Sequence, residues 1–445
     1  MTDKKVTVIG AGLAGCEAAW QIARAGVSVD LIEMKPNRLS DAHHMNTFAE
    51  LVCSNSLRSN QIENAVGLLK EELRRLGSLI MSCADETTVP AGGALAVDRT
   101  SFSELVTQRI HDHSRIHVIN QEATRIPEEG VVIIATGPLT DKEMYQDICR
   151  LLGDQTLHFF DAAAPIITLE SINRDLVFAM SRYDKGGADY LNCPMNKDEY
   201  LAFWQELIGE ELADVKDFDK ETVFEGCMPI ESMAKRGEDT MRFGPLKPVG
   251  LLDPRTGKEP YACVQLRQDD RAASLYNLVG FQTRLKFKEQ ERVFRMIPGL
   301  ENAEFSRHGV MHRNTYLDSP RLLTHQYSLR KDSRIYFAGQ MTGVEGYIES
   351  TGSGFVCGMS AAAQILDKDL PFVFTDQTMI GAMSQYISDE SIRHFAPMNA
   401  NFGLISSLPN RVRGKKERNL CYANRSLDLI DEFAKKLSAF CGEYV

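Results

Sequence analysis

Short runs of apolar, mostly β-branched residues recur along the chain and predict the strands of a parallel sheet. Val6–Ile9 and Val27–Ile32 flank a segment of helix formers, Glu17–Ala25, and together they have the length of one βαβ unit. Val131–Ala135 and Ile335–Ala338 are further runs of the same kind. Continuous apolar runs are typical of strands buried on both faces, so we expect helices on both sides of this sheet.

Helical spacing and polar stretches predict what lies between these strands. Helices are expected over Val66–Leu76, Ser101–His111 and Gly354–Leu366, and the tail from Thr378 also has a helical pattern. Residues 40–64 are polar and rich in His, Asn and Ser, which predicts a long loop, and long loops in compact domains are often functional.

The middle of the chain has a different pattern. Strand-like runs at Ile166–Leu169 and Tyr261–Leu266 alternate with turn clusters, which indicates an inserted α/β domain. We therefore divide the chain into a first part of a nucleotide-binding domain (1–156), an inserted α/β domain (157–318) and a second part of the first domain with a helical, basic tail (319–445).

Composition narrows the class of protein. The chain has 445 residues, of which 43% are hydrophobic and 25% charged, values that suit large globular cores. A net charge of −11 means that any nucleic acid must bind to a local basic patch. No apolar run reaches the roughly 18 residues of a membrane span, and the start of the chain does not read as a signal peptide. The ten cysteines lack zinc-ligand spacing, so we expect reduced thiols, no metal and a cytoplasmic location.

A glycine motif between the first strand and the first helix predicts dinucleotide binding. Gly10, Gly12 and Gly15 have the GxGxxG spacing: the first permits a tight turn, the second a close approach of pyrophosphate, and the third close helix–strand packing. Glu33 ends the second strand, where a carboxylate accepts hydrogen bonds from ribose hydroxyls. A structural βα turn is the alternative, but it leaves Glu33 unexplained.

The C-terminal part of the chain favours FAD over NAD as the bound dinucleotide. A strand ending at Gly339, followed by Gly343, and the earlier Gly137 resemble the pattern of FAD proteins that return to the nucleotide domain late in the sequence. Gln340 departs from this pattern, because it stands where the more usual residue is Asp, which is consistent with a subgroup. A second strand–GxGxxG–helix is absent, so NADH or NADPH is expected to visit transiently. The predicted fold class is α/β, with an FAD-binding Rossmann-like (glutathione-reductase-like) domain. The cofactor-binding candidates are Gly10, Ala11, Gly12, Leu13, Ala14, Gly15, Glu33, Gly137, Gly339, Gln340, Gly343 and Tyr347.

Several longer motifs carry a resemblance to a known family. Gly339-Gln340 with Gly346-Tyr347 is similar to a segment shared by two groups of flavoproteins that modify tRNA uridines. The stretches around Cys53 (ELVCSNSL), Cys227 (FEGCMPIE) and His312 (GVMHRNTY), with HFAPMN from residue 394, resemble one of these groups over essentially the whole chain. That group is the folate- and FAD-dependent tRNA uracil-5-methyltransferases, the TrmFO family. The other group, the wobble-uridine-modifying enzymes, has a longer chain with a further helical domain.

The resemblance implies methylation of C5 of the T-loop uridine in tRNA. Methylenetetrahydrofolate would be the carbon donor, FAD the flavin, and NADH or NADPH the source of electrons. A thiolate that adds to C6 makes C5 nucleophilic, and a second group then removes the C5 proton. Cys53 and Cys227 match the family's motif cysteines. We expect one to attack C6 and the other to assist proton removal or protect the flavin adduct, and the sequence leaves open which.

Other polar residues are candidates for folate or RNA contacts. Tyr347 could stack on the flavin or on a pterin, or be a core tyrosine. His312, Arg313 and Asn314 could bind folate, or form a solvated loop. The cluster of Arg411, Arg413, Lys415 and Lys416 could bind a phosphate backbone, or be an ordinary solvated face.

Three alternative functions stay open from the sequence. The same chemistry could act on a ribosomal RNA uridine, the protein could be an RNA-binding flavoprotein without methyl transfer, or it could be a flavin oxidoreductase that acts on a small molecule. The last leaves both cysteine motifs unexplained. The expected partners are the tRNA T-arm, folate and NAD(P)H, with no membrane and no obligate protein partner.

Overall fold

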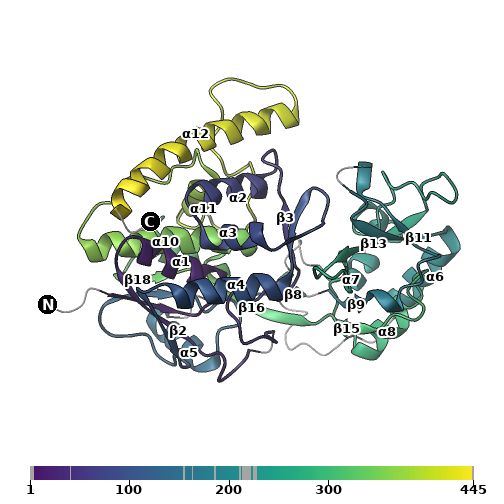
Figure 1. Cartoon of the computed structure of the whole chain (residues 1–445), viewed down its shortest axis with the longest axis horizontal. Helices are drawn as coiled ribbons and strands as arrows, with labels where there is room; N and C mark the ends of the chain where they lie inside the picture. The colour runs from purple at the N-terminus through teal and green to yellow at the C-terminus, as the bar shows by residue number, and fades with distance from the viewer. Residues whose placement is uncertain are drawn as a thin grey trace.

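The computed structural model describes residues 5–40, 42–153, 156–162, 164–184, 187–209, 212, 222–223 and 228–442. These residues form two bodies, each built around its own apolar core (Figure 1). The first core draws on the N-terminal part of the chain and on the part after residue 316, and the second on residues 164–305. The division at residues 156 and 318 stays a prediction.

The first body contains a six-stranded sheet in the order β17-β18-β7-β1-β2-β6. Its strands pair in parallel, apart from the antiparallel β17–β18 edge. The predicted runs at 6–9, 27–32, 131–135 and 335–338 are confirmed as strands with slightly shifted ends. The bounds are β1 Lys5–Ile9, β2 Ser28–Glu33, β6 Ile116–Asn120, β7 Val131–Ile134, β17 Ser328–Leu329 and β18 Asp332–Phe337.

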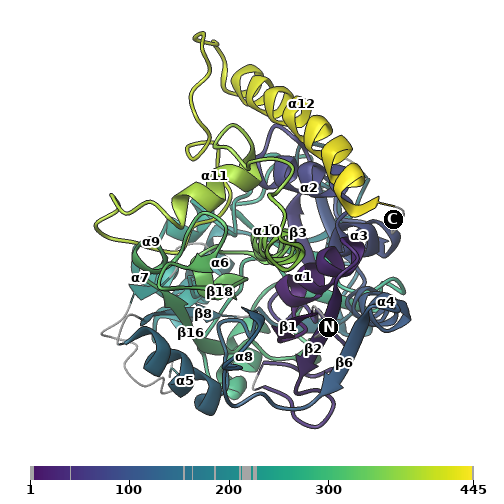
Figure 2. The ribbon, with the colours of Figure 1, turned by 90° about the vertical axis from the view of Figure 1, so that its left-hand side faces the viewer.

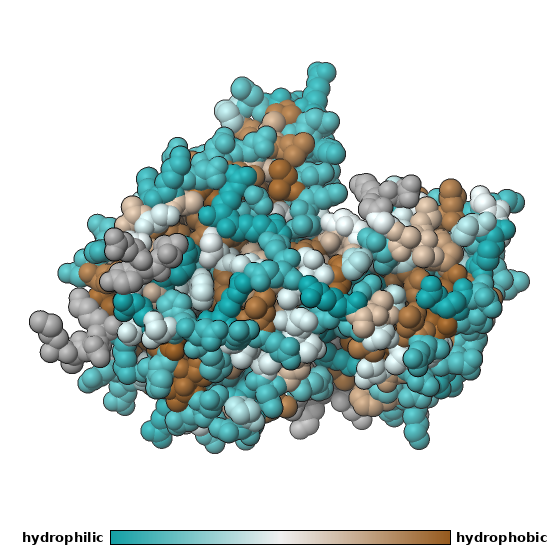
Figure 3. Space-filling view, in the orientation of Figure 1, coloured by the Kyte–Doolittle hydropathy of each residue, from teal (hydrophilic) through white to brown (hydrophobic). Residues whose placement is uncertain are grey.

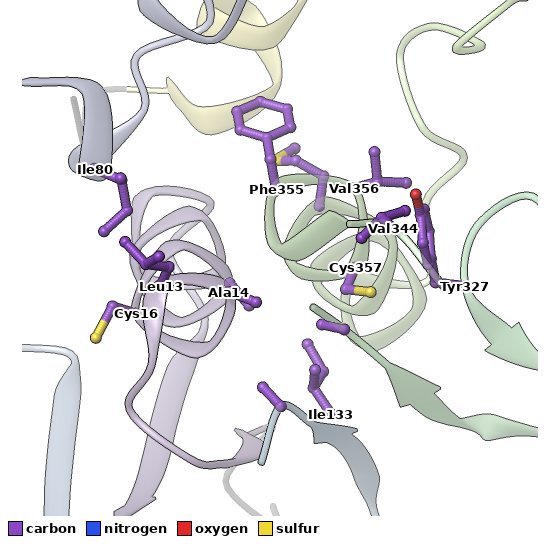
Figure 4. Close-up of a cluster of buried hydrophobic side chains, with 14 of the residues drawn as sticks. Leu13, Ala14, Cys16, Ile80, Ile133, Tyr327, Val344, Phe355, Val356 and Cys357 are labelled. Atoms are coloured by element: carbon purple, nitrogen blue, oxygen red, sulfur yellow. The ribbon is translucent and has the colours of Figure 1, made fainter. Parts of the chain in front are cut away.

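Helices α1 (Leu13–Arg24) and α10 (Tyr347–Leu366) lie side by side on this sheet, as Figures 2 and 4 show. We expected the second of them to begin at Gly354, which is wrong. The helix begins at Tyr347, and Gly352 and Gly354 lie inside it. A Cβ on Gly354 would stand 2.2 Å from the Ala14 carbonyl oxygen, so glycine is required here for the two helix backbones to touch. Packing has outweighed the low helix propensity of glycine.

The remaining helices of the first body pack around this pair. The helices predicted at 66–76 and 101–111 are confirmed as α2 (Ala65–Arg75) and α4 (Arg99–Asp112), and the helical tail as α12 (Lys415–Cys441). The buried Glu72 carboxylate of α2 accepts hydrogen bonds from Met379 and Ile380 at the start of α11 and from Ser426 of α12. The others are α3 Leu79–Glu86, α5 Lys142–Leu152, α9 Ser319–Leu322 and α11 Met379–Tyr386.

The segment expected as one long loop, 40–64, also contains a strand. β3 (Ser56–Ser59) pairs with β5 (Ala94–Val97), which also pairs with β4 (Thr88–Val89). Leu57 of β3 is buried in the first core, and this anchors the polar residues on either side of it.

The second body is built on an antiparallel sheet in the order β10-β11-β13-β14-β9-β15. The strands predicted at 166–169 and 261–266 are confirmed as β9 and β13. Helices α6 (Lys197–Gly209), α7 (Ile230–Lys235) and α8 (Phe287–Phe294) accompany the sheet. The strands are β9 Ile166–Thr168, β10 Phe178–Ala179, β11 Tyr190–Met195, β13 Ala262–Gln268, β14 Leu275–Leu278 and β15 Phe305–Arg307.

Two strands connect the bodies. β8 (Thr156–Ala162) leaves the first body and β16 (Met311–Leu317) returns to it, and the two pair antiparallel from Thr156↔Leu317 to Ala162↔Met311. β12 (Thr222–Val223) adds to the other edge of β8. His312, Arg313 and Asn314 therefore lie in a strand, so the alternative of a solvated loop is wrong.

Candidate functional site

The carboxyl ends of the parallel strands open into one cleft. Its walls come from the turn after β1, the end of β2, the turn after β7, the turn after β18 and the start of α10, and its volume is about 160 Å³. An adjoining hollow of about 70 Å³ shares Gly10, Glu33 and Thr136 with it, which makes the site elongated. Ten of the cofactor-binding candidates line the cleft: Gly10, Ala11, Gly12, Leu13, Ala14, Glu33, Gly137, Gly339, Gln340 and Tyr347.

The three motif glycines have distinct surroundings. Gly10 has φ +99° and a Cβ there would stand 2.6 Å from the Ala135 carbonyl oxygen, so the turn requires glycine. A Cβ on Gly15 would stand 1.8 Å from the Gly10 carbonyl oxygen, which keeps the helix against the turn. A Cβ on Gly12 would meet nothing within 4 Å, so its backbone is open to a ligand.

Glu33 holds the glycine turn as well as facing the cleft. Its Oε2 accepts a hydrogen bond from the Ala11 N–H at 2.7 Å, and its Oε1 accepts one from the Lys35 N–H at 3.0 Å. Each carboxylate oxygen has two lone pairs, so both can still accept from a hydroxyl. The carboxylate therefore suits the predicted ribose contact while it fixes the loop.

The second wall of the cleft is built around the start of α10. Gly339 has φ +84°, and the Gln340 amide donates to both Glu345 oxygens, at 2.8 and 2.7 Å. Gly343 does not line the cleft: it also has φ +84°, and a Cβ there would stand 2.4 Å from the Phe395 ring. Its requirement for glycine is one of packing.

The cleft fits an elongated, anionic dinucleotide. Helices α1 and α10 both begin at its walls after a glycine, Gly12 and Gly346, and no side chain caps either helix start. Such helix starts present N–H groups and the positive end of the helix dipole to the phosphates of a dinucleotide or to the carbonyl oxygens of its ring system. The open face of Gly12 is the place where a pyrophosphate could approach the backbone.

Cys53 is held at the edge of this cleft by Tyr347. The Tyr347 hydroxyl accepts hydrogen bonds from the Cys53 N–H at 2.8 Å and from the Ser54 N–H at 3.2 Å. Burial raises the pKa of Tyr347, so the phenol stays neutral. Tyr347 also lines the cleft, and its hydroxyl holds the cysteine loop. Cys53 itself is half-buried, whereas most of the described cysteines are fully buried.

Residues of the second body hold the other side of the cysteine loop. Arg267 of β13 donates to the Ser54 hydroxyl at 2.6 Å and to the side-chain oxygen Oδ1 of Asn55 at 3.0 Å. The Asn55 amide donates to the Val97 carbonyl at 3.1 Å and to the Gln268 carbonyl at 2.9 Å, so one buried side chain joins the two bodies. The loop is therefore held by hydrogen bonds from both bodies.

Arg99, the first residue of α4, also connects the cysteine loop to the second body. It donates to the Leu51 carbonyl and forms an ion pair with Asp269 at 2.9 Å, with both side chains largely buried. Our sequence analysis missed Arg99, Asn55 and Arg267. Asn55 lies within the quoted motif and could have been found there, but the two arginines come from distant segments without a motif.

The side chains of four predicted site residues lie outside the described part of the structure. Cys227 lies outside the described residues. His312, Arg313 and Asn314 belong to β16, whose backbone pairs with β8 at Asp161, Phe160 and Phe159, and only that backbone is described. Their predicted roles stay predictions.

The basic segment lies at the start of α12. Arg411, Arg413, Lys415 and Lys416 are all exposed, and a hollow of about 380 Å³ is lined by Arg411, Arg413 and Arg418 among others. Asn419 donates to the Glu63 carbonyl at 2.9 Å, which ties this helix start to the segment that follows β3. Figure 3 shows hydrophilic residues interspersed with a group of hydrophobic ones over α12, and a hollow between this part of the surface and the second body.

Neither a metal centre nor a membrane span is found in the described part of the chain. No three of its His, Cys, Asp and Glu side chains are grouped so that they could hold a metal ion. None of its helices is long and apolar enough to cross a bilayer.

Comparisons with known proteins identify similar chains. The family model of glucose inhibited division protein A matches residues 5–369. The chain is 62% identical over 433 residues to a methylenetetrahydrofolate–tRNA-(uracil-5-)-methyltransferase TrmFO of Acetivibrio thermocellus, covering 97% of this chain and 99% of the relative. It is 59% identical over 434 residues to the protein of that name from Enterococcus faecalis, covering 98% and 99%.

A solved structure shares the fold. The structure of Aquifex aeolicus GidA superposes with a TM-score of 0.71, covering 97% of this chain and 74% of the GidA chain, at 16% identity. At that identity the likeness shows the fold alone. It confirms the predicted α/β fold with an FAD-binding Rossmann-type domain.

Proposed function

Because this chain belongs to the TrmFO family of methylenetetrahydrofolate–tRNA-(uracil-5-)-methyltransferases, we propose that it converts the T-loop uridine of tRNA to 5-methyluridine. Methylenetetrahydrofolate is the carbon donor, FAD is the bound flavin, and NADH or NADPH supplies the electrons. The observation that carries the proposal is the position of Cys53, held by Tyr347 at the edge of a cleft that fits a dinucleotide. We place the reaction in the cytoplasm.

The residues of the cleft divide the work of holding FAD. Gly12 and the start of α1 face the pyrophosphate, Glu33 accepts from the ribose, and the turn from Gly339 to the start of α10 faces the ring system. When bound, FAD supplies the redox chemistry that turns the folate-derived carbon into a methyl group. The protein supplies orientation, a hydrophobic wall and helix dipoles.

The thiol chemistry belongs to the chain itself. One of Cys53 and Cys227 adds as a thiolate to C6 of the uracil, and the electron pair of the C5–C6 double bond moves toward O4, which makes C5 nucleophilic. C5 then forms a bond to the one-carbon unit that comes from methylenetetrahydrofolate, and the other cysteine assists removal of the C5 proton. Expulsion of the attacking sulfur then restores the double bond. The hydrogen bonds from Cys53 and Ser54 to Tyr347 hold the backbone of this loop during the addition.

The exposed basic residues at the start of α12 suit the phosphate backbone of tRNA. These residues are exposed, and they form a local group of positive charges on a chain whose net charge is −11. They can therefore attract a polyanion that the rest of the chain would repel. A double variant, Arg411→Gln with Arg413→Gln, should weaken tRNA binding and reduce the salt slope by about 0.7–0.9 per lost phosphate contact. Lys435→Gln with Lys436→Gln, exposed near the other end of α12, is the matched control and should change neither quantity.

The reaction is tested by nucleoside mass spectrometry. The full-length, FAD-loaded protein is incubated with NADH or NADPH, isotopically labelled methylenetetrahydrofolate, and either unmodified tRNA or a ribosomal RNA fragment. We expect labelled 5-methyluridine in tRNA only, and none with Cys53→Ala. Label in the ribosomal fragment alone would refute the substrate. Label in neither, with FAD verified by absorption, would refute methyl transfer.

A further inference from the structure

A buried lysine lies in the wall of the dinucleotide cleft. Lys35 comes two residues after the end of β2, lines the cleft together with Glu33, and is 3% exposed. Among the described residues that line the cleft, Lys35 is the single lysine or arginine and Glu33 the single carboxylate. Glu33 already accepts from the backbone N–H groups of Ala11 and Lys35. A ligand that carries two phosphate groups therefore meets one permanent cation in this wall.

The ammonium group of Lys35 has no anion of the described chain as its partner. Its Nζ donates to the Thr47 carbonyl, and no carboxylate of the described residues forms an ion pair with it. An ammonium group has three N–H donors, so two of them are unused. A buried cation without an anion is costly. The position of Lys35 is therefore explained when the ligand of the cleft supplies the anion.

His43 lines the same cleft and also has an unused donor. Its Nδ1 lies 2.6 Å from the hydroxyl oxygen of Ser40, another residue of the wall. Burial, and then the charge of Lys35, lower the pKa of His43, so the ring is neutral near pH 7 and carries one N–H. When the Ser40 hydroxyl donates to Nδ1, this N–H is on Nε2, to which the described chain offers no acceptor.

The segment that follows His43 is fixed against the first body. The Ala49 N–H donates to the Ala11 carbonyl of the glycine turn at 2.9 Å. The Phe48 N–H donates to the Thr107 hydroxyl of α4 at 2.7 Å. The wall formed by this segment therefore lies beside the glycine turn, and its place does not depend on a ligand.

Lys35 and His43 thus bring one positive charge and unused N–H donors to the cleft that the glycine turn opens into. We propose that Lys35 is the counter-ion of the FAD pyrophosphate and that His43 donates its Nε2–H to the same group. This inference rests on the proposed function, which places FAD in the cleft. It adds side-chain contacts to the phosphates, where the glycine turn supplies backbone N–H groups.

The test measures the binding of FAD, ADP and adenosine to the full-length apoprotein by calorimetric titration. ADP carries the two phosphate groups and adenosine carries none, so the difference between their affinities isolates the phosphate contacts. The unaltered protein should bind ADP at least about tenfold more tightly than adenosine. Lys35→Met should weaken the binding of FAD and ADP roughly tenfold to hundredfold and leave the binding of adenosine unchanged.

Further variants separate charge from packing. Lys35→Arg keeps the positive charge and should retain most of the affinity for FAD. His43→Ala should weaken the binding of FAD and ADP about tenfold. His44→Ala, at the exposed neighbouring position, is the matched control and should change neither affinity.

Three results would overturn the inference. These are equal affinities of the unaltered protein for ADP and adenosine, an unchanged affinity for FAD in Lys35→Met or in His43→Ala, and an equal loss of ADP and adenosine binding in Lys35→Met. The last would show that Lys35 only supports the wall through Thr47. The first does not depend on whether any variant folds. If the affinities change as expected while labelled tRNA is never formed, the inference stands and the proposed methylation fails.

Discussion

Gly354 and Gly352 lie two residues apart in α10, yet we expect their replacement by alanine to have opposite effects. A Cβ at position 354 would stand 2.2 Å from the Ala14 carbonyl oxygen and 2.8 Å from the Ala14 Cα. These are backbone atoms of α1, and Ala14 points toward α10 in Figure 4. To reach even 3.0 Å the helices must move apart locally by 0.8 Å.

The magnitude follows from two opposing contributions. Alanine in place of glycine inside a helix gains about 1 kcal/mol of helix propensity. Overpacking of a tight core costs about 1–3 kcal/mol, and contact with rigid backbone puts Gly354→Ala at the upper end. The net loss is about 2 kcal/mol. At Gly352 the nearest atoms are the Leu69 and Ile380 side chains at 3.7 and 3.8 Å, so the methyl fits and Gly352→Ala should gain about 1 kcal/mol.

The assay is equilibrium unfolding in urea, combined with the temperature at which flavin fluorescence appears on release of FAD. Gly354→Ala should unfold at lower urea and release FAD at lower temperature, because α1 starts at the cofactor turn. Gly352→Ala should be at least as stable as the unaltered protein. Equal stability of the two variants would refute the claim that a backbone contact sets the helix crossing.

Three further predictions concern buried polar groups. Burial lowers the pKa of Lys70 to about 7, whereas the ordinary value is 10.5. Between these two pH values the unfolded chain binds a proton that the folded chain does not, so the free energy of unfolding rises with pH by up to about 1.4 kcal/mol per unit. Lys70→Met should abolish this part of the slope when urea unfolding is measured across that range. Asn55→Ala leaves the Val97 and Gln268 carbonyls and one Arg267 donor without their partner. This should lower the free energy of unfolding by at least about 2 kcal/mol and speed amide hydrogen exchange in β13. Unchanged exchange in β13 would contradict the bridge between the bodies. In Glu33→Gln the NH2 of the new amide would face one of the two backbone N–H groups, of Ala11 and Lys35, that now donate to the carboxylate. This should weaken FAD binding by about 1–3 kcal/mol in calorimetric titration of the apoprotein. Glu128→Gln, at an exposed position, is the control and should leave FAD binding unchanged.

The sequence predicted the local features of this fold well. The continuous apolar runs identified the central strands, since a strand buried on both faces has few other readings. The spacing of Gly10, Gly12 and Gly15 placed the turn before α1, because Gly10 and Gly15 answer local steric demands that the structure displays and Gly12 leaves its backbone open. Cys53 was found through a motif, and the structure places it beside the cleft.

Features set by distant contacts could not be predicted. The start of α10 was misplaced because Gly352 and Gly354 look like a turn until the partner backbone of α1 is known. His312–Asn314 have no alternating apolar pattern, and their strand is stabilised by pairing with a segment about 150 residues earlier. Arg99 and Arg267 contact the Cys53 loop from separate elements, and no local pattern reveals such a convergence.

The loop of Cys53 is shared between two bodies, and this has a consequence for the timing of the chemistry. Ser54 and Asn55 bind Arg267 of the second body, whereas the Cys53 backbone binds Tyr347 of the first. A displacement of the second body on β8 and β16 would break the hydrogen bonds from Arg267 to Ser54 and Asn55 and from Asn55 to Gln268. The cysteine loop would then be held from the first body alone. Contact between the two bodies would thus decide when the cysteine is in position to react.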